Sequence, residues 1–239
     1  NDGLNVSYEC LGDGNYRVTV NLFRDCAEFS DTPPSIAVHI SSSCATLGYI
    51  YLDHQNSQEV SQLCPDAMPN SSCNGGDLPG VDLTVYSGVV SLMPCADWKL
   101  IVAEQNRAAV TNLNDPGLDS RIHIESLLNN ADGQCNTSPA LGNLNLPYIC
   151  VDEPFFYNLG IEEPDGDSLS YALVPALTSG ANGIPYEMNY NPGYSGYFPI
   201  DAISIDQATG QINITPNLIG KYTVVVRVRE YRDGIKIGE

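Results

Sequence analysis

The distribution of cysteines constrains this chain more than any other feature. All eight lie in the first 150 of the 239 residues. They form an even set without the close pairs of a zinc site or a redox C-x-x-C motif. This pattern predicts up to four disulfides in a chain exported to an oxidising compartment. The expected half-cystines are Cys10, Cys26, Cys44, Cys64, Cys73, Cys95, Cys135 and Cys150.

One disulfide pairing is predicted from spacing. Cys64 and Cys73 enclose a short loop rich in Pro and Ser, residues 65–72, and we predict that they bond each other. A closure of this size contributes roughly 2–3 kcal/mol in the chain-entropy account of disulfides. We also predict that all eight cysteines are oxidised.

The charge balance excludes two classes of partner. The chain has 29 acidic and 10 basic residues, a net charge of −19, and residues 122–220 contain no Lys or Arg. Nucleic acid and anionic membrane surfaces both require a basic footprint, so neither is an expected partner. No apolar run approaches the ~20 residues that cross a bilayer. The polar first residues lack a signal-peptide core, so we expect an export signal that has been removed.

The hydrophobic pattern predicts an all-β fold. Residues 16–23 alternate apolar and polar side chains, as a half-buried strand does. Similar runs cover residues 35–40, 83–86, 98–103, 168–173 and 222–228. Turn formers separate them at residues 12–15, 31–34, 74–76, 115–117 and 191–193. Residues 120–130 fit a helix or a loop equally well.

The cysteine boundary suggests two β-sandwich domains. We expect a disulfide-braced β domain over residues 1–150 and an immunoglobulin- or cadherin-like sandwich over residues 151–239, beginning with a strand at 155–157. Asp233-Gly234 is a hairpin signal followed by few residues, so we expect the second sandwich to continue beyond residue 239.

Residues 162–171 contain the densest group of oxygen ligands. Calcium takes six to eight oxygens, and carboxylates that alternate around a glycine can wrap one ion. A solvated acidic turn is the alternative, since Asp-Gly turns are common without metal. The candidate calcium ligands are Glu162, Glu163, Asp165 and Asp167, with Asp206 from a neighbouring loop.

A second candidate site is a group of tyrosines in an Asn-, Pro- and Gly-rich segment. Exposed rings on a loop stack on sugars or anchor a protein partner. The alternative is that they pack beneath the loop and keep it ordered. The residues are Tyr186, Tyr190, Tyr194 and Tyr197.

Nothing in the sequence indicates catalysis. The three histidines are far apart and none lies in a nucleophile–base motif, and adjacent acidic residues on one turn do not predict a glycosidase. We therefore expect no enzyme activity.

An ordered series of short motifs resembles a known family of bacterial surface proteins. It spans essentially the whole chain, and its order is more specific than any one match. The motifs are Tyr8-Glu9-Cys10, Phe23-Arg24-Asp25-Cys26, Leu63-Cys64-Pro65, Cys73-Asn74-Gly75-Gly76, Cys95-Ala96-Asp97-Trp98, Asp165-Gly166-Asp167-Ser168, Ala208-Thr209-Gly210 and Glu230-Tyr231-Arg232-Asp233-Gly234. The series is similar to gliding-motility-associated adhesins of Bacteroidota, which the type IX secretion system exports. Residues 104–107 depart from the Cys-Cys-Arg-Asn run that relatives often carry, so the family's disulfide connectivity does not transfer.

The resemblance implies a non-catalytic adhesin or stalk module at the bacterial cell surface, used in gliding or attachment. It also implies a cadherin-like second part in which the acidic turn binds calcium. The expected partners are other surface proteins, glycans or copies of the chain itself. Two alternatives stay open: a subunit of an extracellular filament or sheath, and the carbohydrate-binding module of a secreted enzyme.

Overall fold

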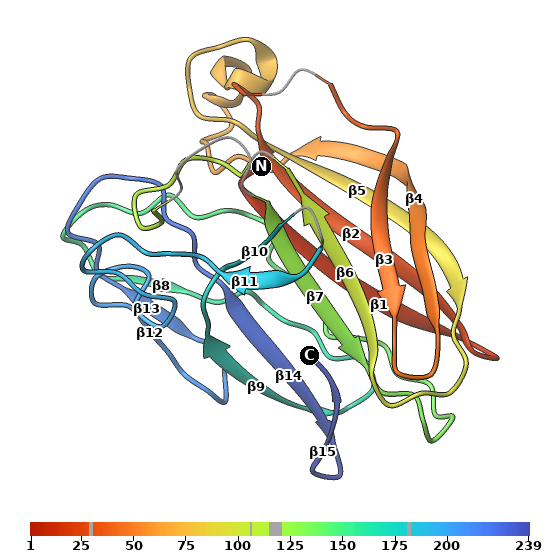
Figure 1. Cartoon of the computed structure of the whole chain (residues 1–239). Coiled ribbons are helices and arrows are strands. Elements are labelled where there is room, and N and C mark those ends of the chain that lie inside the picture. Colours follow the sequence, from red (N-terminus) through yellow and green to blue (C-terminus); the bar gives the residue numbers. More distant parts are fainter. Residues whose placement is uncertain (29–30, 106, 115–120, 181–182) are drawn as a thin grey trace.

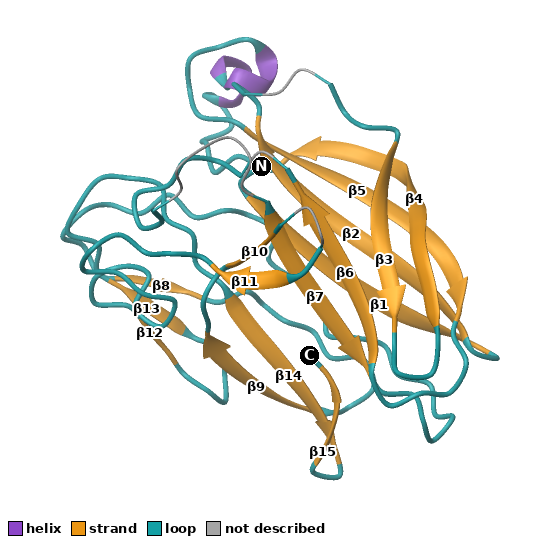
Figure 2. Cartoon of the chain, in the orientation of Figure 1, coloured by secondary structure: helices purple, strands orange, loops and turns teal. Residues whose placement is uncertain are grey.

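The chain folds almost entirely into β-strands. The computed structural model describes residues 1–28, 31–105, 107–114, 121–180 and 183–239. Within these ranges the helical elements are two short 3-10 turns, Met68–Asn70 and Ser72–Asn74 (Figure 1, Figure 2). Neither is long or apolar enough to span a bilayer, and the same holds for every helix in the described ranges. The predicted all-β class is confirmed.

Most strands belong to one large antiparallel sheet. Its order is β1-β2-β5-β4-β3-β6-β7-β15-β14-β9, and β10 joins β7 to β11. The strands are β1 (Gly3–Gly12), β2 (Asn15–Asp25), β3 (Ser35–Ser41), β4 (Thr46–Glu59), β5 (Val81–Ser91), β6 (Trp98–Glu104), β7 (Ile122–Leu128), β9 (Ser168–Leu173), β10 (Leu177–Ser179), β11 (Pro185–Glu187), β14 (Val226–Arg232) and β15 (Ile235–Gly238).

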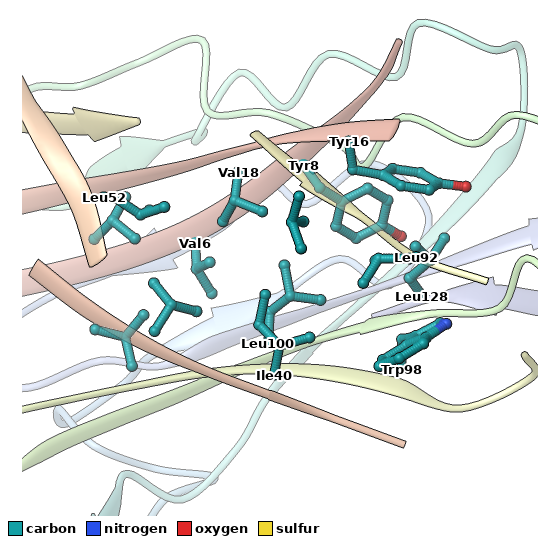
Figure 3. Close-up of a cluster of buried hydrophobic side chains, with 14 of the residues drawn as sticks. Val6, Tyr8, Tyr16, Val18, Ile40, Leu52, Leu92, Trp98, Leu100 and Leu128 are labelled. Atoms are coloured by element: carbon teal, nitrogen blue, oxygen red, sulfur yellow. The ribbon is translucent and has the colours of Figure 1, made fainter. Parts of the chain in front are cut away.

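The sheet curls, so that strands at its two sides face each other across a core. In Figure 3, Val6 and Val18 from β1 and β2 point toward Ile40 and Leu100 from β3 and β6. Trp98 is fully buried, and its indole nitrogen donates to a main-chain carbonyl 2.9 Å away. This buried apolar face drives the closure of the sheet.

Strands from both sides of residue 150 share the large sheet. β15 pairs with β7 at Gly238↔Leu128, and β14 pairs with β9 over six residues. A separate small sheet, β12 (Ser204–Ile205), β13 (Ile212–Ile214) and β8 (Phe155–Tyr157), covers a second apolar cluster that includes Ile200 and Ile203. The predicted strand at 155–157 is therefore confirmed as β8, but a division into two sandwiches is not confirmed.

Five of the six predicted strand runs lie in observed strands, namely β2, β3, β5, β6 and β9. The sixth is only partly right, because β14 begins at Val226 and not at residue 222. The ambiguous segment 120–130 contains a strand, β7. Asp233 and Gly234, both at positive φ, form the predicted two-residue hairpin between β14 and β15. The turn expected at 115–117 lies outside the described residues.

Three disulfides form from six of the eight cysteines. The bonds join Cys10 to Cys135, Cys26 to Cys73 and Cys44 to Cys95. Cys64 and Cys150 are exposed free thiols, so the expectation that all eight are oxidised is not met in this structure.

The predicted Cys64–Cys73 bond is wrong, and the pairing of β2 with β5 explains why. The two strands pair over their full length, ending at Asp25↔Val81. Cys26 directly follows β2, and its main-chain nitrogen donates to the Gly80 carbonyl 3.0 Å away. The loop with Cys73 folds back onto the same place, since a Cβ built on Gly80 would lie 2.7 Å from the Cys73 sulfur. Sheet register, which is not visible in cysteine spacing, decides this bond.

Candidate metal centre

Four carboxylates gather where the loop before β9 meets β14. One oxygen from each of Glu163, Asp165, Asp167 and Glu230 lies within 4.8 Å of the others. We call these four residues the acidic site. β9 and β14 are adjacent in the sheet, with Glu230 opposite Leu169, and this pairing brings the two segments together (Figure 1).

The loop of the acidic site is held by its own side chains. The carboxylate of Glu163 accepts hydrogen bonds from the main-chain nitrogens of Asp165, at 2.9 Å, and Asp167, at 2.5 Å. Gly166, between the two aspartates, has φ +84°, a conformation that other residues rarely adopt. The turn therefore has a fixed shape that places both aspartates beside β14.

Glu230 is the buried member of the site. Its side chain has no exposed surface, and Asn136 Nδ2 donates to one carboxylate oxygen at 2.8 Å. The other oxygen, Oε1, is buried without a hydrogen-bond partner in the described part of the chain. Burial raises the pKa of Glu230 to about 7, reinforced by the negative charges of Glu163 and Asp167 and by a hydrogen bond that protonated Glu230 makes with Glu163. An ionised carboxylate there needs a further positive partner.

Arg232 supplies part of the positive charge. Its guanidinium donates to Asp167 Oδ1 through Nε at 3.0 Å and to Asn136 Oδ1 through Nη2 at 2.9 Å. It also lies 3.7 Å from Asp165. One guanidinium among four ionised carboxylates leaves a net charge of −3 in the site.

A disulfide anchors the residues before position 150 that contact this site. Cys135 is bonded to Cys10, and the next two residues both contact the acidic site. Asn136 bridges Glu230 and Arg232, and the main-chain nitrogen of Thr137 donates to Asp165 Oδ2 at 2.7 Å. The site therefore joins residues near 136 to the loop at 163–167 and to β14.

The chemistry of this donor set fits a hard divalent cation. All four side chains offer oxygen, which calcium and magnesium prefer over nitrogen and sulfur. While Glu230 is ionised, its Oε1 has no hydrogen-bond partner among the described residues, and a cation beside it would offset the cost of burying that oxygen. The excess negative charge favours a 2+ ion over a 1+ ion at the same place.

The sequence analysis included three of the four residues of the acidic site among its candidate ligands. Glu162 is exposed and Asp206 is fully exposed, and neither belongs to the described acidic site. Asp206 instead accepts three hydrogen bonds within its own turn, from Ala208 and Thr209, which lower its pKa. Glu230 was missed. The pattern that could have revealed it is the alternation along β14. Val226, Val228 and Glu230 lie on the same face of the strand, so Glu230 is a charged residue where the pattern expects an apolar one.

The predicted tyrosine group divides into two pairs. Tyr190 accepts a hydrogen bond from the Ala176 nitrogen at 2.9 Å, and Tyr194 packs edge-on against Tyr222. These two hold the segment down. Tyr186 and Tyr197 are 58% and 59% exposed, and so remain available to a ligand.

A second exposed aromatic surface lies on β4, a strand that the sequence analysis did not predict. Tyr49 and Tyr51 are 67% and 70% exposed and lie two residues apart on one face of the strand, with Leu47 beside them. The His39 ring on β3 contacts the Tyr49 ring edge-on, with centroids 5.1 Å apart.

The histidines form short pairs. His123 Nε2 lies 3.0 Å from Glu125 Oε1, and His54 Nε2 lies 3.1 Å from Ser57 Oγ. In a catalytic triad the histidine lies between the nucleophile and a carboxylate. Ser57 Oγ makes its other contact with the hydroxyl of Thr84, at 3.2 Å. Neither pair resembles an activated nucleophile.

Comparisons with protein-family models, curated proteins and solved structures found no match to this chain.

Proposed function

We propose that this chain is a non-catalytic module of an exported cell-surface protein, in which a divalent cation at the acidic site fixes the loop before β9 to β14 and to residues 136–137. The observation that carries the proposal is Glu230, a fully buried carboxylate whose Oε1 lacks a partner among the described residues and which faces three more carboxylates. Calcium is the expected ion, because the site offers several carboxylate oxygens, from the loop before β9 and from β14, and calcium takes six to eight oxygen ligands.

The extracellular location is supported by the disulfides. Three bonds form between cysteines far apart in sequence, and bonds of this kind persist in oxidising compartments. The surface is strongly acidic, which keeps such a module soluble and unattractive to nucleic acid. An adhesin or stalk role in gliding or attachment is consistent with both features.

Calcium binding is tested by thermal unfolding with added calcium and with chelator. Binding to the folded state alone stabilises it by about 2.7 kcal/mol at a hundredfold excess over Kd. For a chain of this length that raises Tm by roughly 5–10 °C. The double variant Asp165→Asn/Asp167→Asn should lose the calcium-dependent rise.

The matched control is Glu162→Gln/Asp206→Asn, which removes two carboxylates outside the acidic site and leaves Asp206's turn a capping oxygen. This control should keep the full calcium response. Equal Tm values with calcium and with chelator in the unaltered protein would reject the cation site.

The location is tested on intact cells of the source organism. External protease should degrade the protein while a cytoplasmic marker stays intact. Full protection of the protein, with lysis restoring its cleavage, would reject a surface role.

A glycan-binding role is the second candidate, and the exposed aromatic side chains favour it. Rings that are exposed on a rigid strand can stack on sugars without a large ordering cost. We expect Tyr49→Ala/Tyr51→Ala to reduce binding to cells or glycan arrays, with Tyr186→Ala/Tyr197→Ala as the matched pair of similar exposure. Reduced binding only in Tyr186→Ala/Tyr197→Ala would assign glycan binding to those two tyrosines. Unchanged binding in both double variants would reject stacking on these rings.

Assembly into a filament with copies of itself would need a free sheet edge or a large apolar face. The outer edge of β1 is covered in part, because Ser138 donates its main-chain nitrogen to the Tyr8 carbonyl at 2.8 Å. On the outer edge of β9, Tyr171 likewise donates to the Gln207 carbonyl at 2.9 Å. These contacts favour a module that binds other molecules over one that grows by strand addition.

A further inference from the structure

Two exposed thiols remain in a chain whose other cysteines are oxidised. Cys64 and Cys150 are both in loops, and Cys64 follows β4 while Cys150 precedes β8. Exposed thiols in an oxidising compartment are readily converted to disulfides. The question is therefore whether the fold brings these two together.

The segments that contain them are in contact. The main-chain nitrogen of Tyr148 donates to Gln62 Oε1 at 3.0 Å, and the Tyr148 hydroxyl donates to the Pro79 carbonyl at 3.4 Å. Leu144, Leu146 and Val60 pack on the same apolar cluster, which Phe23, Val81 and Leu83 form. Residues 144–148 therefore lie against the chain at 60–62.

Each cysteine is two residues beyond this contact. Cys64 follows Gln62, and Cys150 follows Tyr148. Two residues of extended chain span about 7 Å at most, so neither thiol is far from the point where the segments meet. A disulfide needs its Cα atoms about 4.4–6.8 Å apart. Both cysteines are exposed loop residues, so the bond requires a local adjustment of these loops; Ile149 packs on the second apolar cluster, which assigns most of that adjustment to the loop after Gln62.

The other six cysteines leave this as the remaining pair. Cys73 is bonded to Cys26, so it is not available as the partner that sequence spacing predicted for Cys64. Cys135 is likewise bonded to Cys10, which removes it as a partner for Cys150. A fourth intramolecular bond that preserves the three observed ones therefore joins Cys64 to Cys150.

We propose that Cys64 and Cys150 form a fourth disulfide, made by exchange with a disulfide oxidant such as oxidised glutathione. One thiolate attacks the oxidant, giving a mixed disulfide and one released thiol. The second protein thiolate then attacks the mixed disulfide at the protein sulfur and releases a second thiol. The two cysteines lose two protons and two electrons, which reduce the oxidant to two thiols.

The bond would tether the approach to β8. Residues 136–154 connect the last disulfide-bonded cysteine, Cys135, to the strand that starts at Phe155. Cross-linking Cys150 to the chain after β4 holds this connection against the large sheet. It would also extend the disulfide bracing to the place where the cysteine-free part of the chain begins.

The test is disulfide mapping of the full chain. The protein is incubated with oxidised glutathione, alkylated, digested without reduction and analysed by mass spectrometry. We expect a peptide pair linked through Cys64 and Cys150 beside the three known bonds, and no thiol titratable after denaturation. The variants Cys64→Ser and Cys150→Ser should each leave one unpaired cysteine, found as a titratable thiol or as a single glutathione adduct, which assigns the bond to this pair.

Three results would overturn the proposal. The first is two titratable thiols, or two glutathione adducts, after oxidation of the folded protein. The second is a bond from Cys64 to Cys73. The third is a covalent dimer on a non-reducing gel that disappears in Cys64→Ser or in Cys150→Ser, because it would assign these thiols to contacts between chains.

Discussion

Replacing Glu230 by Gln is expected to change stability in opposite directions with and without calcium. Glu230 is fully buried, and its pKa in the folded protein rises from 4.5 to about 7. A raised carboxyl pKa means that the folded state holds the proton more tightly than the unfolded state. The associated stabilisation is full below pH 4.5 and is lost as the pH rises through 7.

The size of this effect follows from the pKa difference. At about 1.4 kcal/mol per pKa unit, the shift from 4.5 to about 7 corresponds to roughly 3 kcal/mol. Gln is neutral at every pH and keeps a carbonyl oxygen for the hydrogen bond from Asn136. At pH 8 without metal, Glu230→Gln should therefore be more stable than the unaltered protein by up to about 3 kcal/mol. At pH 4.5 or below most of this gain should vanish.

The assay is thermal unfolding followed by circular dichroism, at pH 8 and pH 4.5, in buffer stripped of divalent metal. The gain at pH 8 corresponds to a rise in Tm of roughly 6–12 °C for a chain of this length. With saturating calcium the order should reverse, because the variant has lost a buried ligand. Glu162→Gln, an exposed acid outside the acidic site, is the control for the loss of one charge.

Two outcomes would refute this reasoning about the buried carboxylate. A Tm change of equal size at both pH values would show that the proton on Glu230 is not linked to folding. A lower Tm for Glu230→Gln at pH 8 without metal would show that Arg232 and Asn136 already compensate the ionised group.

The remaining predictions concern the disulfide beside the acidic site, the core and one strained turn. Cys10→Ser/Cys135→Ser removes a disulfide that closes a loop with a sequence separation of 125, and it should lower the free energy of unfolding by about 5 kcal/mol. It should also reduce the rise in Tm on adding calcium, measured by calorimetry. An undiminished rise would show that the acidic site does not depend on this bond. Trp98→Ala should lower the free energy of unfolding in urea by about 3–5 kcal/mol, whereas Met93→Ala, at an exposed residue nearby, should lower it by less than about 1 kcal/mol. Similar urea midpoints for the two variants would contradict the packing of Trp98 in Figure 3. Gly210→Ala should destabilise more than Gly133→Ala, because both have positive φ but only Gly210 would place a Cβ 2.9 Å from a ring, that of Tyr171.

The sequence predicted the strands whose two faces differ most clearly. β2 and β3 alternate buried and half-exposed residues along the core, so their period of two is visible in the sequence. β4 was missed, because its second half is exposed on both faces and is therefore polar throughout. β7 was missed, because residues 120–130 were expected to form a helix or a loop; a short apolar segment such as residues 122–128 does not show by its period that it is a strand.

The candidate site was predicted only where its residues are neighbours in sequence. Glu163, Asp165 and Asp167 belong to one acidic turn, and composition alone reveals it. Glu230 and Asn136 reach the same place through strand pairing and through a disulfide, which no local pattern encodes. Asp206 was expected to reach the site from a neighbouring loop, but it lies outside the acidic site and its Oδ1 accepts hydrogen bonds within its own turn.

The pairing of β15 with β7 has a consequence for the order of folding. β7 ends at Leu128, but the strands that pair with its outer edge come later: β10 begins at Leu177 and β15 at Ile235. During synthesis or export from the N-terminus, β7 therefore emerges long before both of these strands. An uncovered strand edge is a template for pairing with another chain, and distant pairings form slowly. Newly made chains are therefore expected to be most prone to pair with one another before residue 238 has emerged.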